Sequence, residues 1–217
     1  MRIFLVRHGE AADDVNGTIG CECDDPLTEL GRWQARSLAA RLAEVRFGSI
    51  WASPLSRATD TARVVCASNG GTLRTTPALM EIRAGVLAGM SRPQAEGAYP
   101  ELFEAWASGG DATPAGGENQ RTIFYPRVRA FYREQLADDR DRDAVLIVTH
   151  AGPANVILNE FFDLEYADYP AFRLQPGSLS VFGLDRGRRS VECINATGHL
   201  ECPLIHTTAP SADDGAR

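Results

Sequence analysis

Apolar and polar positions along the chain follow two alternating patterns, one typical of buried strands and one typical of helices. Short continuous apolar runs bounded by polar residues predict strands that are covered on both faces. Between them, apolar residues recur every three or four positions, as in amphipathic helices. This alternation predicts a three-layer α/β/α fold with a mostly parallel central sheet and helices on both faces. The predicted strands are residues 3–6, 49–52, 73–79, 144–148, 179–184 and 191–195.

Helix starts can be placed from residues that favour the first turn. Thr28 is a good N-cap for an apolar stripe that runs to Val45. Ser53 and Pro54 predict a second helix through about residue 67, because Pro is favoured at the first helical position. Residues 152–153 (GP) predict a third helix through Phe162.

A different pattern separates the third and fourth predicted strands. Two helical patterns, residues 92–106 and 119–137, are split by the Gly-rich segment 108–117. We interpret residues 85–117 as an inserted helical cap over the sheet, within a single α/β domain of residues 1–206. The last residues, 207–217, are small and polar, which predicts a disordered tail.

The charge balance excludes some functions. The 217 residues include 22 basic and 29 acidic side chains, so the net charge is −7, which argues against a nucleic-acid partner. Every basic residue is Arg and none is Lys. Lysine Schiff-base chemistry and the lysine-dependent phosphate loop are therefore excluded, and Arg remains as the strong anion ligand.

The number and spacing of the Cys residues and the sequence at the start of the chain predict a cytoplasmic protein. The five Cys residues are odd in number and scattered, unlike a disulfide framework. Cys21 and Cys23 lack the two-residue gap usual in zinc sites, so we expect no metal there. The apolar run at residues 3–6 is too short for a signal peptide or a membrane span, and we expect no membrane partner.

Three chemically active residues follow predicted strands. Arg7 and His8 end the first strand, and His150 ends the strand at residues 144–148. Ligand sites in open α/β sheets gather at the carboxyl ends of the strands, so these side chains are expected to converge. Arg57 falls in the first turn of the second predicted helix, where free N–H groups and the helix dipole favour an anion. A guanidinium there can hold a phosphate with two hydrogen bonds.

At this point the chain resembles a known family, the histidine phosphatase superfamily, which includes cofactor-dependent phosphoglycerate mutases and many small phosphatases. The resemblance to the small phosphatases is the greater. Four blocks occur in the family's order and carry the resemblance: residues 7–10 (RHGE), 24–31 (DDPLTELG), 53–62 (SPLSRATDTA) and 149–152 (THAG).

The resemblance implies a role for each matched residue. His8 would be the nucleophile that forms a phosphohistidine intermediate, with its other ring nitrogen held as N–H by a backbone carbonyl. Arg7, Arg57 and His150 would bind the phosphoryl oxygens, aided by the backbone N–H of Ala151. Glu81, in a block that resembles the phosphatase form, would protonate the leaving oxygen and then take a proton from water.

One departure from the family pattern falls in the phosphate site itself. Asp14 stands where many members have an Asn that helps to hold phosphate. An ionised carboxylate there repels phosphate. Three alternatives stay open: Asp14 points away, Asn16 substitutes for the missing amide, or the site is retuned.

The leading hypothesis is a metal-independent phosphomonoester hydrolase that acts on a small phosphorylated metabolite and needs no cofactor. A phosphoglycerate mutase is the alternative. A mutase needs clustered basic residues in the insert, whereas Arg92 and Arg121 are widely separated here. A non-catalytic phosphate sensor is the third hypothesis, disfavoured because all five matched side chains are present. A homodimer remains open. Specificity is expected to depend on residues 11–23 and on the cap.

Overall fold

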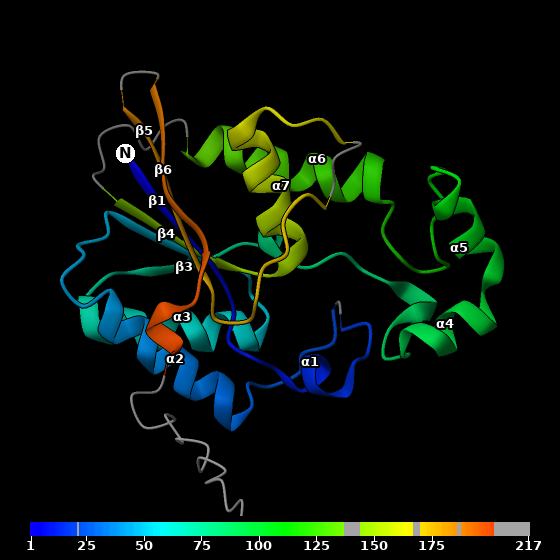
Figure 1. Ribbon diagram of the computed structural model, residues 1–217, viewed down its shortest axis with the longest axis horizontal. Helices are drawn as coiled ribbons and strands as arrows, with labels where there is room; N and C mark the ends of the chain where they lie inside the picture. The colour runs from blue at the N-terminus through cyan, green and yellow to red at the C-terminus, as the bar shows by residue number, and fades with distance from the viewer. Residues whose placement is uncertain (21, 137–143, 167–169, 186–187, 202–217) are drawn as a thin grey trace, which may run out of the picture.

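A six-stranded sheet forms the centre of the molecule (Figure 1). The computed structural model describes residues 1–20, 22–136, 144–166, 170–185 and 188–201. Strands β1 to β4 are parallel, whereas β5 runs antiparallel to β1 and β6 antiparallel to β5. The sheet order is β3-β2-β4-β1-β5-β6. The strand bounds are Arg2–Arg7 (β1), Ser49–Ala52 (β2), Leu73–Thr75 (β3), Ala144–Thr149 (β4), Leu179–Asp185 (β5) and Arg188–Ala196 (β6).

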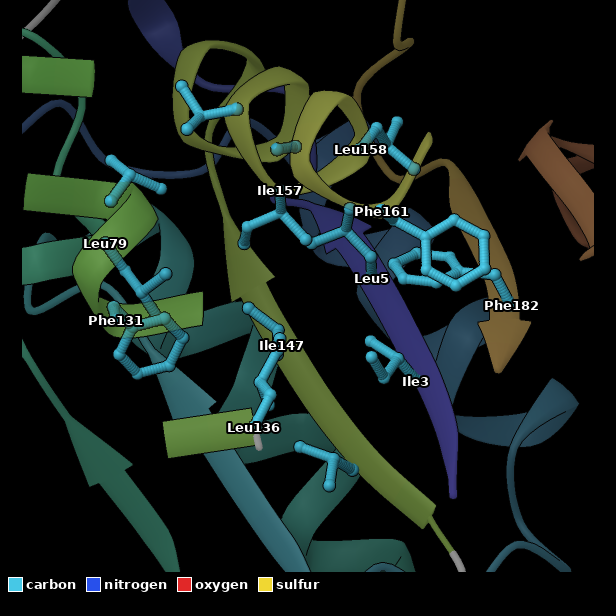
Figure 2. Close-up of a cluster of buried hydrophobic side chains, with 14 of the residues drawn as sticks. Ile3, Leu5, Leu79, Phe131, Leu136, Ile147, Ile157, Leu158, Phe161 and Phe182 are labelled. Carbon is cyan, nitrogen blue, oxygen red and sulfur yellow. The ribbon is translucent and has the colours of Figure 1, made fainter. Parts of the chain in front are cut away.

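Helices cover both faces of this sheet, which confirms the predicted three layers. Successive side chains of a strand point to opposite faces. Ile3 and Leu5 of β1 therefore pack with helices α6 (Tyr125–Phe131) and α7 (Ala151–Phe162), in the cluster drawn in Figure 2. Phe4 and Val6 of the same strand belong to the cluster on the other face. The helices on that face are α2 (Glu29–Arg41) and α3 (Ser56–Asn69).

The predicted helix start is correct for α2, one residue late for α7, which begins at Ala151, and two residues early for α3. The hydroxyl of Thr28 accepts a hydrogen bond from the N–H of Gly31, as an N-cap does. Helix α3 begins at Ser56 rather than after Ser53. The hydroxyl of Ser53 lies 2.8 Å from Nε2 of His150 and accepts a 3.3 Å hydrogen bond from the N–H of Leu55, which precedes α3, so it bonds ahead of the helix and does not cap it.

One proline breaks a segment predicted as a single helix, and another lies where a second, continuous helical segment changes its hydrogen bonding. Pro100 separates α4 (Arg92–Ala98) from α5 (Pro100–Ala107), because proline disfavours a helical conformation at the preceding residue. Pro126 lies at the start of α6, which is flanked by wider π-helical turns at Gln120–Phe124 and Tyr132–Leu136. Pro126 has no N–H for the regular helical bond, which explains the wide turn before it.

The helices α4 and α5 have a hydrophobic cluster of their own. Ala84, Leu87 and Ala95 are its buried members, and Phe103 and Trp106 of α5 pack against them. Figure 1 shows both helices at the right-hand end, beyond the sheet and its flanking helices. We use the name cap for residues 85–117, which carry these helices.

Short elements complete the structure. Helix α1 is Ala12–Asn16, and 3-10 turns occur at Pro77–Leu79, Gly85–Leu87 and Gly198–Leu200. The strand predicted at 73–79 is shorter, because Thr76 caps the first of these turns. No helix of the described residues is long and apolar enough to cross a membrane. The predicted tail, 207–217, lies outside the described residues.

Candidate active site

The carboxyl ends of β1, β2 and β4 bring the predicted site residues together. Arg7 is paired with Thr149 in the parallel register of β1 and β4, and the N–H of His8 donates to the carbonyl of Thr149 at 2.9 Å. This register places His8 and His150 side by side, with ring centroids 4.9 Å apart. The predicted convergence at the sheet edge is therefore present.

His8 is held in one tautomer. Its Nδ1 lies 2.7 Å from the carbonyl oxygen of Gly9. A carbonyl can only accept a hydrogen bond, so Nδ1 carries the proton and Nε2 is the unprotonated nitrogen with the lone pair. Nε2 accepts a 3.2 Å hydrogen bond from Nε of Arg57. Burial, and then the nearby charge of Arg57, lower the pKa of His8 to about 3, so the ring is neutral near pH 7.

Two arginine side chains surround this nitrogen. Arg57, the second residue of α3, is only 1% exposed, and its Nη1 donates to the carbonyl of Cys23 at 2.6 Å. Arg7 donates from Nη1 to the carbonyl of Leu174 at 2.8 Å, and its Nε is buried without a partner among the described residues. The backbone bonds fix both guanidinium groups where an anion in front of His8 would meet them.

His150 adds a second neutral imidazole. It is 1% exposed, and burial followed by the neighbouring charges lowers its pKa well below the usual value. Its Nε2 contacts Ser53, while its Nδ1 has no partner in the described part of the chain. His150 precedes the first turn of α7, so the N–H of Ala151 lies at a helix N-terminus beside it. The contact with Ser53 was missed, because a Ser-Pro pair is also a common helix start.

Glu81 faces the same cavity from the segment before the cap. Its two carboxylate oxygens accept hydrogen bonds from the N–H groups of Gly152 and Ile82, each at 2.9 Å. Burial raises the pKa of Glu81, although these hydrogen bonds and the arginine charges oppose the shift. A carboxyl group with a raised pKa can be protonated near neutral pH and can donate its proton to a leaving oxygen.

A buried ion pair holds the segment that carries Glu81. Nη1 of Arg127 donates to the backbone carbonyls of Pro77, Ala78 and Met80 at 2.8, 2.9 and 3.2 Å. The same guanidinium forms two hydrogen bonds with the carboxylate of Glu118. This positioning was not predicted, because it joins residues that are almost 50 positions apart in the sequence.

The structure resolves the question raised by Asp14. Its carboxylate forms an ion pair with Nη2 of Arg7 and accepts a hydrogen bond from the N–H of Ala11. Asp14 therefore points into the site, and phosphate must compete with it for Arg7. Asn16 is exposed and is not among the residues that line the cavity, so the structure does not bring this candidate to the site. Of the three alternatives, this arrangement fits the retuned site, in which Asp14 alters how the site binds phosphate.

These groups line a cavity of 610 Å³. Its walls include two neutral imidazoles, two guanidinium groups and a carboxyl group, a set suited to phosphoryl transfer. Within the described residues, no group of three or more His, Cys, Asp or Glu side chains could hold a metal ion. The five side chains Arg7, His8, Arg57, Glu81 and His150 line the cavity, together with Ala151.

Comparison with known proteins agrees with this arrangement. The family model of the histidine phosphatase superfamily (branch 1) matches residues 3–197. Adenosylcobalamin/alpha-ribazole phosphatase of Salmonella typhimurium is 29% identical over 197 residues, which cover 90% of this chain and 96% of that protein. Phosphoserine phosphatase 1 of Hydrogenobacter thermophilus is 26% identical over 200 residues, with coverage of 92% and 94%.

A solved structure shares the fold over the same length. Alpha-ribazole phosphatase from Shigella flexneri superposes with a TM-score of 0.83 at 27% sequence identity, covering 90% of this chain and 96% of that one. The family match spans both the sheet and the cap, and these relatives are phosphatases. The chain therefore belongs to the histidine phosphatase superfamily and is a phosphatase.

Proposed function

We propose that the protein hydrolyses phosphomonoesters of small metabolites through a phosphohistidine intermediate on Nε2 of His8, without a metal ion. The observation that carries this proposal is the state of His8. Its Nδ1 proton is held by Gly9, and its low pKa keeps the Nε2 lone pair available near pH 7. An imidazole nitrogen that is unprotonated and surrounded by guanidinium groups is suited to attack an anionic phosphate.

In the first step, Nε2 of His8 attacks phosphorus and the bond from phosphorus to the ester oxygen breaks. Protonated Glu81 donates its proton to that leaving oxygen, so a neutral alcohol departs. Arg7, Arg57 and His150 bind the three phosphoryl oxygens and stabilise the charge of the transition state. The guanidinium groups supply the positive charge that a metal ion supplies in other phosphatases.

In the second step, water attacks the phosphohistidine. The carboxylate of Glu81, now ionised, accepts a proton from this water as the oxygen bonds to phosphorus. The bond between phosphorus and Nε2 breaks, inorganic phosphate leaves, and His8 is again neutral with its proton on Nδ1. Glu81 regains its proton, so the cycle closes.

The alternative is a phosphoglycerate mutase that uses the same nucleophile. A mutase must hold a phosphorylated product by its second anionic group and transfer phosphate back to it. Arg92, one of the two widely separated arginines considered for that role, is exposed and forms an ion pair with Glu96. Hydrolysis is therefore the function that we favour.

Phosphate release from p-nitrophenyl phosphate and from sugar, nucleotide and glycerate phosphates tests the proposal. Wild type is compared with His8→Ala, each with and without EDTA. We expect turnover that EDTA does not affect, and a loss of at least about 10³-fold in the variant, because the covalent route is removed.

Two results would contradict the proposal. Normal turnover by His8→Ala would remove His8 as nucleophile, and loss of activity in EDTA would indicate a metal-dependent reaction. Interconversion of phosphoglycerates without net phosphate release would favour the mutase instead. Wild type incubated with substrate that carries a labelled phosphoryl group, and quenched with detergent at alkaline pH, should carry label on histidine, because the P–N bond is labile in acid and stable in base. His8→Ala should carry none.

A further inference from the structure

A second cavity lies beneath the cap. Its volume is 760 Å³, within the range usual for small-molecule sites and larger than the cavity around His8. Most of its inner wall is apolar and comes from the cap and from the loop after α1. The apolar wall includes Ile19, Ile82, Leu87, Phe103, Trp106 and Pro114.

This second cavity adjoins the active-site cavity. Ile19, Ile82 and Pro170 line both. Ile82 directly follows Glu81, and its N–H donates to the Glu81 carboxylate. On the proposed mechanism the leaving oxygen lies at Glu81, so the rest of the leaving group extends past Ile82 into the second cavity.

The aromatic wall of this cavity offers hydrocarbon rather than hydrogen bonds. The indole N–H of Trp106 donates to the carbonyl of Ala112 at 2.8 Å, so the one polar atom of that side chain is already satisfied. Phe103 packs edge-to-face on Trp106, with ring centroids 5.0 Å apart. An apolar or aromatic group gains contact area against this wall, whereas a polar group would lose hydrogen bonds to water.

Three of the four charged side chains that line the cavity are already paired. Arg92 forms an ion pair with Glu96 at 2.7 Å and lies over the ring of Phe103. Glu118, a buried wall residue, is held by Arg127 from outside the cavity, and the fourth, Arg83, is exposed. A second phosphate or a carboxylate on the substrate would have to compete with Glu96 for Arg92 and would share the cavity with Glu118, so a strongly anionic leaving group fits poorly.

We propose that the natural substrate is a phosphomonoester with a bulky, largely apolar leaving group that contains an aromatic ring system, and that the second cavity binds this group. This inference rests on the proposed function, because it places the leaving group in the second cavity from the role of Glu81 as the acid that protonates the leaving oxygen. A leaving group as small as serine or glycerate would leave the wall of Phe103 and Trp106 in contact with water.

Two aryl esters test this assignment. Phenol and 2-naphthol have similar acidity, so phenyl phosphate and 2-naphthyl phosphate differ chiefly in apolar size. We expect kcat/KM for the naphthyl ester to be about tenfold higher, because the second ring buries additional apolar area. Glycerol 3-phosphate, with a small polar leaving group, should be the poorest of the three.

Variants of residues in the cavity wall test whether this wall causes the preference for the naphthyl ester. Trp106→Ala should remove most of the tenfold preference, because kcat/KM should fall more for the naphthyl ester than for the phenyl ester. Ala107→Gln is a milder second variant, because Ala107 lines the cavity and is exposed, so the change places an amide at the wall without disturbing the core. Its matched control is Ala98→Gln, an exposed cap alanine that does not line the cavity. The control should keep the full preference.

The outcomes distinguish this inference from the proposed function. Equal kcat/KM for the two aryl esters in wild type would overturn it, as would a preference that survives both wall variants. Calorimetry with the same esters and His8→Ala gives a readout without turnover. Tighter binding of the naphthyl ester, with no phosphate release by wild type, would refute the proposed function and support the cavity assignment. Equal binding would overturn the assignment.

Discussion

The basic half of the active site (Arg7, His8, Arg57 and His150) and its carboxylate half (Glu81 and Asp14) come from different kinds of structure. The basic residues lie at the ends of β1 and β4 and in the first turn of α3, all but Arg7 nearly fully buried. The two carboxylates lie on connecting segments, Asp14 in the short helix α1 and Glu81 between a 3-10 turn and the cap.

This difference indicates which residues act on the phosphoryl group and which determine how the rate depends on the leaving group. The basic half depends on the register of neighbouring strands, and on the proposed mechanism it binds phosphorus and its oxygens, which are common to every phosphomonoester. Asp14 competes with that same phosphate for Arg7, whereas Glu81 is held by a contact with the distant Gly152 and on the proposed mechanism meets the leaving group, which varies. Changes at Glu81 should therefore have effects that depend on the substrate, and changes at Asp14 should affect phosphate binding in general.

Of the variants that test this comparison, Glu81→Gln is expected to have the largest effect on kcat. The variant cannot protonate a leaving oxygen, so kcat for an alkyl phosphate should fall about 10²-fold. p-Nitrophenolate leaves without much proton assistance, so p-nitrophenyl phosphate should lose far less and serves as the internal control. Equal losses for both esters would contradict the role of Glu81 as the acid.

The pH dependence of the rate is expected to follow from the ionisation of Glu81. Glu81 acts as an acid only when protonated, and burial raises its pKa, which extends the protonated range upward. The rate with an alkyl phosphate should therefore fall as pH rises through that pKa, and Glu81→Gln should lack this descending limb. His8, with a pKa of about 3, should contribute no change above about pH 4.

A smaller effect, about tenfold on kcat for alkyl esters, is expected for Arg127→Met. The change removes the bonds to the carbonyls of Pro77, Ala78 and Met80, so the segment that carries Glu81 is less well positioned. Because Arg127 touches no reacting atom, the loss should be smaller for p-nitrophenyl phosphate, and Arg127→Lys should restore part of it.

Arg129→Met is the matched control for that change. Arg129 lies on the same helix, is half-exposed and pairs with Glu160, away from the Glu81 segment. We expect normal kinetics with both esters. If Arg127→Met lowered the rates with both esters equally, its role would be to support the fold alone, and a thermal unfolding measurement would show that loss directly.

The smallest effect is expected for Asp14→Asn. The carboxylate of Asp14 occupies Arg7 and repels phosphate, so its removal should lower KM several-fold and strengthen inhibition by inorganic phosphate, with kcat nearly unchanged. Asp13→Asn is the comparison, because Asp13 lines the same cavity and is not the partner of Arg7. A higher KM in Asp14→Asn would mean that the carboxylate assists binding.

The basic half could be predicted from sequence because its signals are local. Apolar runs that end at Arg7 and at Thr149 predict buried strands, and parallel strands end at one edge of a sheet. Arg57 still lies in the first turn of α3, although the helix begins two residues later than predicted. The two cap helices could also have been separated, since Pro100 carries a known restriction on the residue before it.

The carboxylate half could not be predicted in the same way. The ion pair of Asp14 with Arg7 depends on where α1 returns the chain, and no periodic pattern specifies that. The bonds from Arg127 to the segment near residue 80 join positions almost 50 residues apart. The placement of Asn16 could not be predicted for the same reason, since it depends on helix α1, which leaves this side chain exposed.

The pairing of Arg7 with Thr149 in β1 and β4 also affects how this protein can change in length during evolution. Deleting one residue from β1 would exchange the two faces of that strand and carry His8 away from His150, so folding and catalysis would fail together. A residue gained or lost in the cap leaves this pairing intact. Descendants of this gene can therefore acquire new substrates by lengthening or trimming residues 85–117, while their strands keep a constant length.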